Sequence, residues 1–197
     1  MIDQIPFDVS VSYDERGHDI ANRPAEMRQA IQWLSEQLTR ADLEPRQRAQ
    51  AYGMCGVWAR VLHDFDAAHT FLQRALDLAQ QLNDPRLLFV NRIRLAHVYQ
   101  WQRQFDRSNA LFADLLATSR DQPGLAAQLD FLYQHAGKNA LDQQQYDRAE
   151  QYFTQALHLR RLKADPALIE STEQALAALQ HQRQHRKLNE SDSAPGS

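Results

Sequence analysis

Apolar residues recur at helical spacing in three segments of the chain. In each segment two large apolar residues stand four positions apart, which places them on one face of a helix. The three pairs are Leu72 with Leu76, Phe112 with Leu116, and Phe153 with Leu157. The chain also contains only 6 Gly and 7 Pro in 197 residues, which leaves little material for the turns of an all-β fold. The pattern therefore predicts amphipathic helices.

The three segments align without gaps, over residues 56–76, 96–116 and 137–157. An aromatic residue followed by Asp marks each copy: Phe65-Asp66, Phe105-Asp106 and Tyr146-Asp147. In each copy one small residue precedes a second small residue by twelve positions. These pairs are Gly56 with Ala68, Ala96 with Ser108, and Gly137 with Ala149. Small side chains on facing helices let two helix axes approach closely, so each copy is expected to form an antiparallel helical hairpin.

The pattern resembles the tetratricopeptide repeat (TPR), whose usual period is about 34 residues. The longer period of this chain resembles the extended-helix variants of kinesin light chains and several bacterial regulators. The resemblance implies an all-α fold, a TPR-like α-solenoid of stacked antiparallel helical hairpins. We expect three repeats at about 46–85, 86–123 and 124–166.

Helices on both sides of the repeats are expected to act as caps, at about 24–40 and 166–186. Pro24 and Pro166 mark their starts, because Pro is favoured in the first turn of a helix. Together with the repeats they give one helical domain over 23–187. Residues 1–22 lack helical periodicity and are expected to form an irregular or disordered strap. Residues 188–197 are polar, with Ser, Gly, Pro and acidic residues, and we expect a disordered tail.

The formal net charge is −3, so no broad positive field would attract nucleic acid. The apolar runs are too short to cross a membrane, and residues 1–6 lack the features of a signal peptide. We therefore expect a cytoplasmic protein that binds neither nucleic acid nor membrane. Only three of the 22 basic residues are Lys, a bias that suggests a bacterial origin. The one cysteine, Cys55, excludes an internal disulfide and a Cys-based zinc site.

No catalytic motif is present in the sequence. Gly-rich phosphate loops, HExxH, CxxC and serine nucleophile elbows are all missing. We therefore predict no enzyme activity, no catalytic residue, no cofactor and no metal site. His181 and His185 have a spacing that can hold a metal on one helix face. A solvated helix end is the favoured interpretation, since no carboxylate follows before Glu190.

The resemblance implies that the first helix of each repeat lines a concave groove. The predicted groove residues are Gln50, Met54, Val57, Arg60, Arg94, His97, Trp101, Phe131, Gln134, His135 and Lys138. Cations and aromatic side chains predominate among them, and carboxylates are missing. This predicts a protein–protein interaction adaptor or scaffold that binds an acidic or amphipathic peptide or partner domain.

Three alternatives stay open at this point. The predicted groove residues are equally consistent with a solvated surface whose ligand binds elsewhere. The chain could instead be a structural self-assembly protein, a homo-oligomer joined by its terminal helix or N-terminal strap. The strap could also occupy the groove itself, because Asp3, Asp8, Asp14 and Glu15 give it acidic character.

Overall fold

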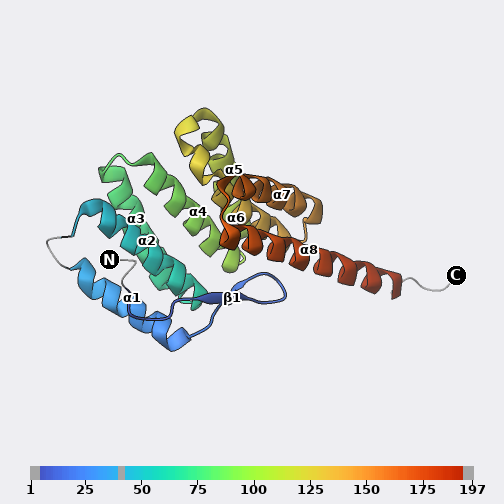
Figure 1. Cartoon of the computed structure of the whole chain (residues 1–197), viewed down its shortest axis with the longest axis horizontal. Helices are drawn as coiled ribbons and strands as arrows, with labels where there is room; N and C mark the ends of the chain where they lie inside the picture. Colours follow the sequence, from blue (N-terminus) through green and yellow to red (C-terminus); the bar gives the residue numbers. More distant parts are fainter. Residues whose placement is uncertain (1–4, 40–42, 193–197) are drawn as a thin grey trace. The chain divides into compact units, whose positions relative to one another are not determined.

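The structure is a computed structural model that describes residues 5–39 and 43–192, with side chains through residue 186. It confirms the all-α prediction: the elements are helices, apart from two short strands that pair with each other (Figure 1). In chain order the elements are β1 (Val11–Tyr13), β2 (Asp19–Ala21), α1 (Pro24–Leu38), α2 (Pro45–Val61), α3 (Phe65–Gln81), α4 (Pro85–Trp101), α5 (Phe105–Asp121), the 3₁₀ helix η2 (Pro123–Gln128), α6 (Leu129–Asp142), α7 (Tyr146–Lys163) and α8 (Pro166–Asp192).

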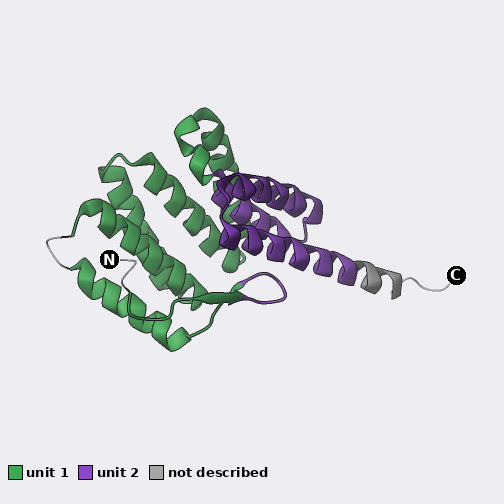
Figure 2. Cartoon of the chain, viewed as in Figure 1, with its two compact units in different colours: residues 1–12, 19–128 green, residues 13–18, 129–197 purple. Residues whose placement is uncertain are grey.

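The chain divides into two compact units, coloured separately in Figure 2. Unit 1 comprises Met1–Ser12 and Asp19–Gln128, and unit 2 comprises Tyr13–His18 and Leu129–Ser197. The division does not separate the two helices of any hairpin. The pairs α2–α3 and α4–α5 belong to unit 1, and the pair α6–α7 belongs to unit 2.

In unit 1 each helix packs against the next along the chain, and α4 also contacts α2. The N-terminal segment contributes to the core of this unit. Its apolar side chains are partly buried against a cluster that includes Met27, Leu34 and Trp58. The contributing residues are Ile5, Phe7, Val9 and Val11. Within the predicted strap of residues 1–22, residues 11–13 and 19–21 form the two strands, and the rest of residues 5–22 contains no helix or strand.

The paired helices approach closely at the glycines that the repeat pattern singles out. A Cβ added to Gly56 would lie 2.6 Å from Cγ of Leu72, and one added to Gly137 would lie 2.5 Å from Cε1 of Phe153. Leu72 and Phe153 are themselves fully buried. Each glycine thus gives the facing helix room for a large side chain that fills the core of its hairpin.

Four helices end in the same left-handed turn, although none of the four turn residues is glycine. These residues are His63, Asn83, Arg103 and Gln144, with φ between 49° and 61°. After α6, for example, Gln144 N–H donates to the Leu141 carbonyl and Gln145 N–H donates to the Ala140 carbonyl. This pair of bonds is the Schellman motif, which closes the helix end and turns the chain.

In unit 2, α8 packs on α6 and α7, and a buried polar network joins the three helices. The Arg160 guanidinium of α7 donates to Asp130 of α6 at 3.4 Å and to Thr172 of α8 at 2.7 Å. Lys163 donates to the same carboxylate at 2.5 Å. Asp130 and Arg160 are each 3% exposed, so their charges are balanced inside the protein.

The last helix is longer than the sequence predicts. It was expected to end at about residue 186, and α8 continues to Asp192. The prediction of a disordered tail is therefore wrong for residues 188–192, where polar residues extend the helix. Residues 193–197 lie outside the described residues.

We predict that Gly137→Ala lowers the free energy of unfolding by about 1–3 kcal/mol, because the added methyl group meets the rigid Phe153 ring. The higher helix propensity of Ala offsets only about 1 kcal/mol of this loss. Urea unfolding followed by circular dichroism measures the change. Gln151→Ala, at an exposed position of α7, serves as a control and should be nearly neutral. A Gly137→Ala protein as stable as the wild type would contradict the close approach.

We predict that Gln144→Gly raises the free energy of unfolding by about 0.5 kcal/mol, because glycine adopts a positive φ without steric strain. The gain exceeds the entropy that glycine adds to the unfolded chain. The matched control is Gln151→Gly within α7, which should lower stability by about 1 kcal/mol. The same urea titration tests both, and a loss of stability in Gln144→Gly would contradict the prediction.

Candidate functional site

The eleven predicted groove residues fall in both units, so each set is described within its own unit. Seven lie on α2 and α4 in unit 1, and four lie on α6 in unit 2. Every one of the eleven is partly or fully buried. Arg60, His97, Gln134 and Lys138 are the most enclosed, with 2–7% of each residue exposed.

Arg60 of α2 is held by the N-terminal segment of its own chain. Its Nη2 donates to Oδ2 of Asp19 in β2 at 2.6 Å, and both side chains are nearly buried. The guanidinium also lies 4.3 Å from the ring centroid of Trp101. Trp101 is fixed in turn by the hydrogen bond from its indole N–H to Nε2 of His97, at 3.0 Å. Arg60 therefore already has a carboxylate and an aromatic partner.

Arg94 of α4 has a different environment. Its Nη1 donates to Oδ1 of Asn91 at 3.0 Å, and its Nη2 lies 3.5 Å from the sulfur of Met54. Its Nε is buried and has no hydrogen-bond partner among the described residues. Burial without a neighbouring negative charge lowers the pKa of Arg94 to about 10. Arg94 is thus a guanidinium held by an amide and a thioether, with no carboxylate.

Two neighbours fix the position of this guanidinium. A Cβ added to Gly53 of α2 would lie 2.3 Å from Nη1 of Arg94, so the guanidinium rests directly on the glycine backbone. Asn91 is fully buried, and its amide donates to the Leu87 carbonyl at 3.0 Å. The amide therefore presents its oxygen to Arg94 in a set orientation. Arg94 is preorganised in the absence of any ligand.

In unit 2 the predicted cation Lys138 is covered by Tyr13, whose ring centroid lies 4.8 Å from the ammonium group. The Tyr13 hydroxyl is 3.1 Å from Oγ of Ser171 in α8. On the same helix, α6, the rings of Phe131 and His135 meet edge to face at 4.4 Å. Lys138 is therefore packed against an aromatic ring rather than presented to a ligand.

Gln134, also on α6, is one of several buried polar groups with an unsatisfied atom, among them Arg60, whose Nη1 has no partner in the described residues. It is 2% exposed, and neither its side-chain oxygen nor its nitrogen has a hydrogen-bond partner among the described residues. A buried amide in this state costs free energy, so Gln134 would gain from a water molecule or a ligand that supplied the missing bonds.

The loop of residues 13–18 is attached to α6 by a histidine. Nε2 of His18 lies 2.8 Å from Oδ1 of Asp142, and Nδ1 lies 3.6 Å from Asp14 of its own loop. Burial disfavours the charged imidazole and by itself would lower the pKa of His18. The hydrogen bond to Asp142 and the charges of Asp142 and Asp14 outweigh that effect and the repulsion from Lys138, so the pKa of His18 is raised above 6.5.

The acidic residues that suggested a strap over the groove have other partners. Asp8 forms an ion pair with Arg23, and Asp14 accepts hydrogen bonds from the backbone of its own turn. Glu15 is exposed, and Asp3 lies outside the described residues. The contact with a predicted groove cation comes instead from Asp19. Sequence reasoning missed Asp19, Asn91 and Gly53, because their roles depend on contacts between elements far apart in the chain.

The remaining candidate groups are the Cys55 thiol and the side chains that could bind a metal ion. Burial raises the pKa of the Cys55 thiol to about 12, against the weaker opposing effect of a hydrogen bond to Ser35, so the thiol is unreactive at neutral pH. Within residues 5–39 and 43–192, no group of three or more His, Cys, Asp or Glu side chains could hold a metal ion. None of the helices described combines the length and the hydrophobicity needed to span a bilayer.

The raised pKa of His18 predicts a pH-dependent contribution to stability. A raised folded-state pKa gives stabilisation that is fully present below the unfolded value of about 6.5 and lost as pH rises through the folded value. We expect the wild type to exceed His18→Gln in free energy of unfolding by more at pH 6 than at pH 8.5. Urea titrations at the two pH values measure this. A difference that does not change with pH, or one larger at pH 8.5, would contradict the assignment.

Comparisons with known proteins bear on the fold. No protein-family model matches the sequence, and no curated protein matches it. Among solved structures, the chain is similar to the crystal structure of BtubC (BKLC) from P. vanneervenii, with a TM-score of 0.56 and 18% sequence identity. The alignment covers 88% of this chain and 77% of BtubC. At this identity the similarity concerns the fold of the chain.

Proposed function

We propose that this chain is a cytoplasmic adaptor of the tetratricopeptide type, which binds an acidic or amphipathic peptide or partner domain. The site that we propose is the surface of α2 and α4 around Arg94 in unit 1. One observation carries the proposal: Arg94 is a preorganised guanidinium that lacks a carboxylate partner.

Of the other cations on these two helices, Arg48 and Arg86 donate to backbone carbonyls, and the remaining three pair with carboxylates. Arg60 pairs with Asp19, Arg46 with Asp84, and Arg92 with Asp114. Unlike Arg46, Arg60 and Arg92, Arg94 has no such ion pair in the described residues, and burial lowers its pKa to about 10. An unpaired charge that is removed from water destabilises the protein, so a site of this kind indicates a role in binding.

The free donors of Arg94 specify the chemistry of the ligand. Nε–H and Nη2–H are neighbouring donors on one edge of the guanidinium, and such an edge can bind the two oxygens of a carboxylate together. In the structure Nε has no acceptor, and Nη2 has only the weak sulfur acceptor of Met54. An Asp or Glu side chain, or a chain terminus, would supply both oxygens once the side chains that enclose Nε move aside.

The surroundings of Arg94 also favour apolar contacts. Met54 of α2 is partly exposed and contacts the guanidinium through its sulfur. The flexible thioether of Met54 can adapt to ligand side chains of different shapes. A peptide that combines a carboxylate with an apolar side chain matches both features.

The geometry narrows the predicted site. Sequence analysis did not distinguish among Arg60, Arg94 and Lys138, and two of these have partners within the chain. Arg94 is therefore the residue on which the proposed binding depends. Self-assembly through α8 or the N-terminal segment stays an alternative prediction.

The test uses two pools of fluorescein-labelled peptides on the full-length protein. One pool carries Glu and Asp among random apolar residues, and the other carries Lys and Arg at the same positions. We expect fluorescence polarisation to detect binding of the acidic pool. Arg94→Gln should weaken this binding at least about tenfold, the effect of losing one charge-assisted pair of hydrogen bonds.

Arg92→Gln is the matched control, because Arg92 lies on the same helix and already pairs with Asp114. It should leave peptide binding nearly unchanged. The free energy of unfolding of Arg94→Gln should equal or exceed that of the wild type, since the substitution removes an unpaired buried charge. Equal binding of the acidic pool by Arg94→Gln and the wild type, or equal binding of the two pools by the wild type, would refute the proposal.

A further inference from the structure

Two histidines on α8 form a close pair that the proposed function does not use. His181 and His185 are both exposed, and their Nε2 atoms lie 3.1 Å apart. Their ring centroids are 4.4 Å apart, with the rings inclined at 68°. The sequence showed only that the two residues share a helix face. The structure adds that the two rings form a hydrogen bond between their Nε2 atoms, which a metal ion bound to both nitrogens would replace.

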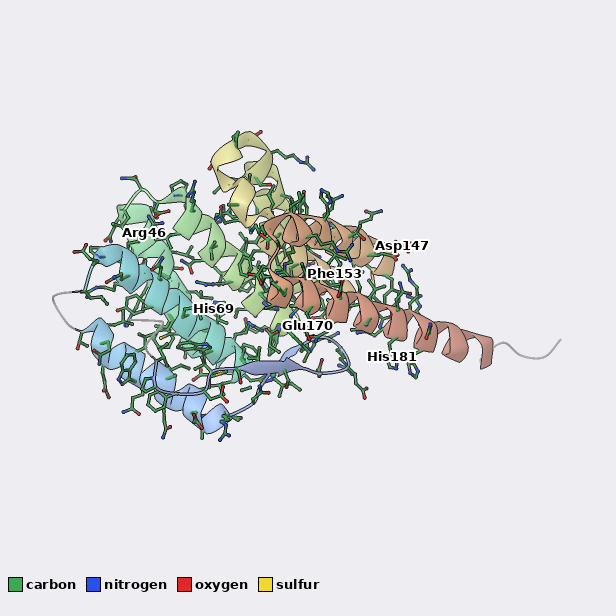
Figure 3. All side chains as sticks on the ribbon, viewed as in Figure 1. Arg46, His69, Asp147, Phe153, Glu170 and His181 are labelled. Atoms are coloured by element: carbon green, nitrogen blue, oxygen red, sulfur yellow. The ribbon has the colours of Figure 1, made fainter. Side chains whose placement is uncertain are left out.

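The pair faces away from α7. Arg183, between the two histidines in sequence, reaches α7 and pairs with Asp147 at 2.6 Å and with Glu150 at 3.1 Å. Two positions along an α-helix correspond to a rotation of about 200°, so His181 and His185 both lie on the side opposite to Arg183. Figure 3 shows His181 on this outward side of α8. Both imidazoles are therefore open to solvent and to solutes.

The separation of the nitrogens fits two ligands of one metal ion. Transition metals bind imidazole nitrogen at about 2.0–2.1 Å. Two nitrogens 3.1 Å apart then subtend an angle of about 100° at the metal, between the octahedral and tetrahedral values. Neutral imidazole is the form that binds a metal, and imidazole suits Zn²⁺, Cu²⁺ and Ni²⁺.

We propose that His181 and His185 form a bidentate site for a divalent transition-metal ion. Within the described residues no further His, Cys, Asp or Glu completes a set of three. The remaining coordination positions are therefore left to water or to a ligand atom of another molecule. The site differs in this from a closed structural zinc site, which has four protein ligands.

The small number of protein ligands limits the affinity of the site. Arg183, between the two histidines, is neutralised by its two carboxylates. With two neutral ligands, we expect a dissociation constant on the order of 10 μM for Ni²⁺.

The experiment is isothermal titration calorimetry, in which NiCl₂ is added to the full-length, tag-free protein in a buffer that does not chelate metals. We expect one Ni²⁺ per chain. His181→Ala and His185→Ala should each weaken binding at least about tenfold, because either change leaves a single imidazole. His158→Ala on α7 is the control and should bind Ni²⁺ like the wild type. Both residues of the pair are exposed, and circular dichroism verifies that the variants fold.

Three results would overturn the proposal. The first is no binding of Ni²⁺ at concentrations up to about 1 mM. The second is wild-type affinity in the protein that carries both substitutions. The third is unchanged affinity in each single variant, which would mean that the two imidazoles bind independently. Paramagnetic broadening by Ni²⁺ provides a separate readout, since we expect it to affect the ring signals of His181 and His185 first.

Discussion

The close approach of two helices at a glycine is the contact on which the hairpins α2–α3 and α6–α7 depend most directly. At Gly56 and Gly137 the absence of a side chain lets Leu72 and Phe153 fill the space between the paired helices. A single methyl group at either glycine would overlap these buried side chains. The spacing that results determines where the side chains of α2 and α6 lie. In unit 1, α2 contributes Gly53 and Met54 to the candidate site, where they contact Arg94 of α4.

Much of the helical architecture could be predicted because its signals are local. The small and aromatic residues of each repeat lie within about twenty positions of one another, and Pro24 and Pro166 are the first residues of α1 and α8. The left-handed turns at the helix ends were harder to predict from the sequence. A left-handed helix end usually has glycine, whereas this chain uses His63, Arg103 and Gln144 at equivalent positions of its repeats. Backbone hydrogen bonds to the preceding turn of the helix stabilise that conformation, and the residue types at these positions do not predict it.

The candidate site shows where reasoning from the sequence reached its limit. A periodic pattern identifies Arg60 and Arg94 as members of one surface, but it does not show which of them has a partner inside the chain. Asp19 is 41 positions away from Arg60 in sequence, and it reaches Arg60 because the N-terminal segment packs on unit 1. Whether a guanidinium already has a carboxylate partner decides whether a ligand can bind to it. The ion pair between Arg60 and Asp19 depends on the tertiary structure, so the sequence pattern does not reveal it.

The packing of the N-terminal segment has a consequence for work with shortened chains. Ile5, Phe7, Val9 and Val11 shield the apolar surface around Met27 and Leu34. Trimming the protein to begin at its first helix would bare that surface, and exposed apolar patches promote aggregation. It would also remove Asp19 from Arg60 and leave that guanidinium without its carboxylate. Acidic molecules captured by such a fragment would report a surface that the intact chain keeps covered.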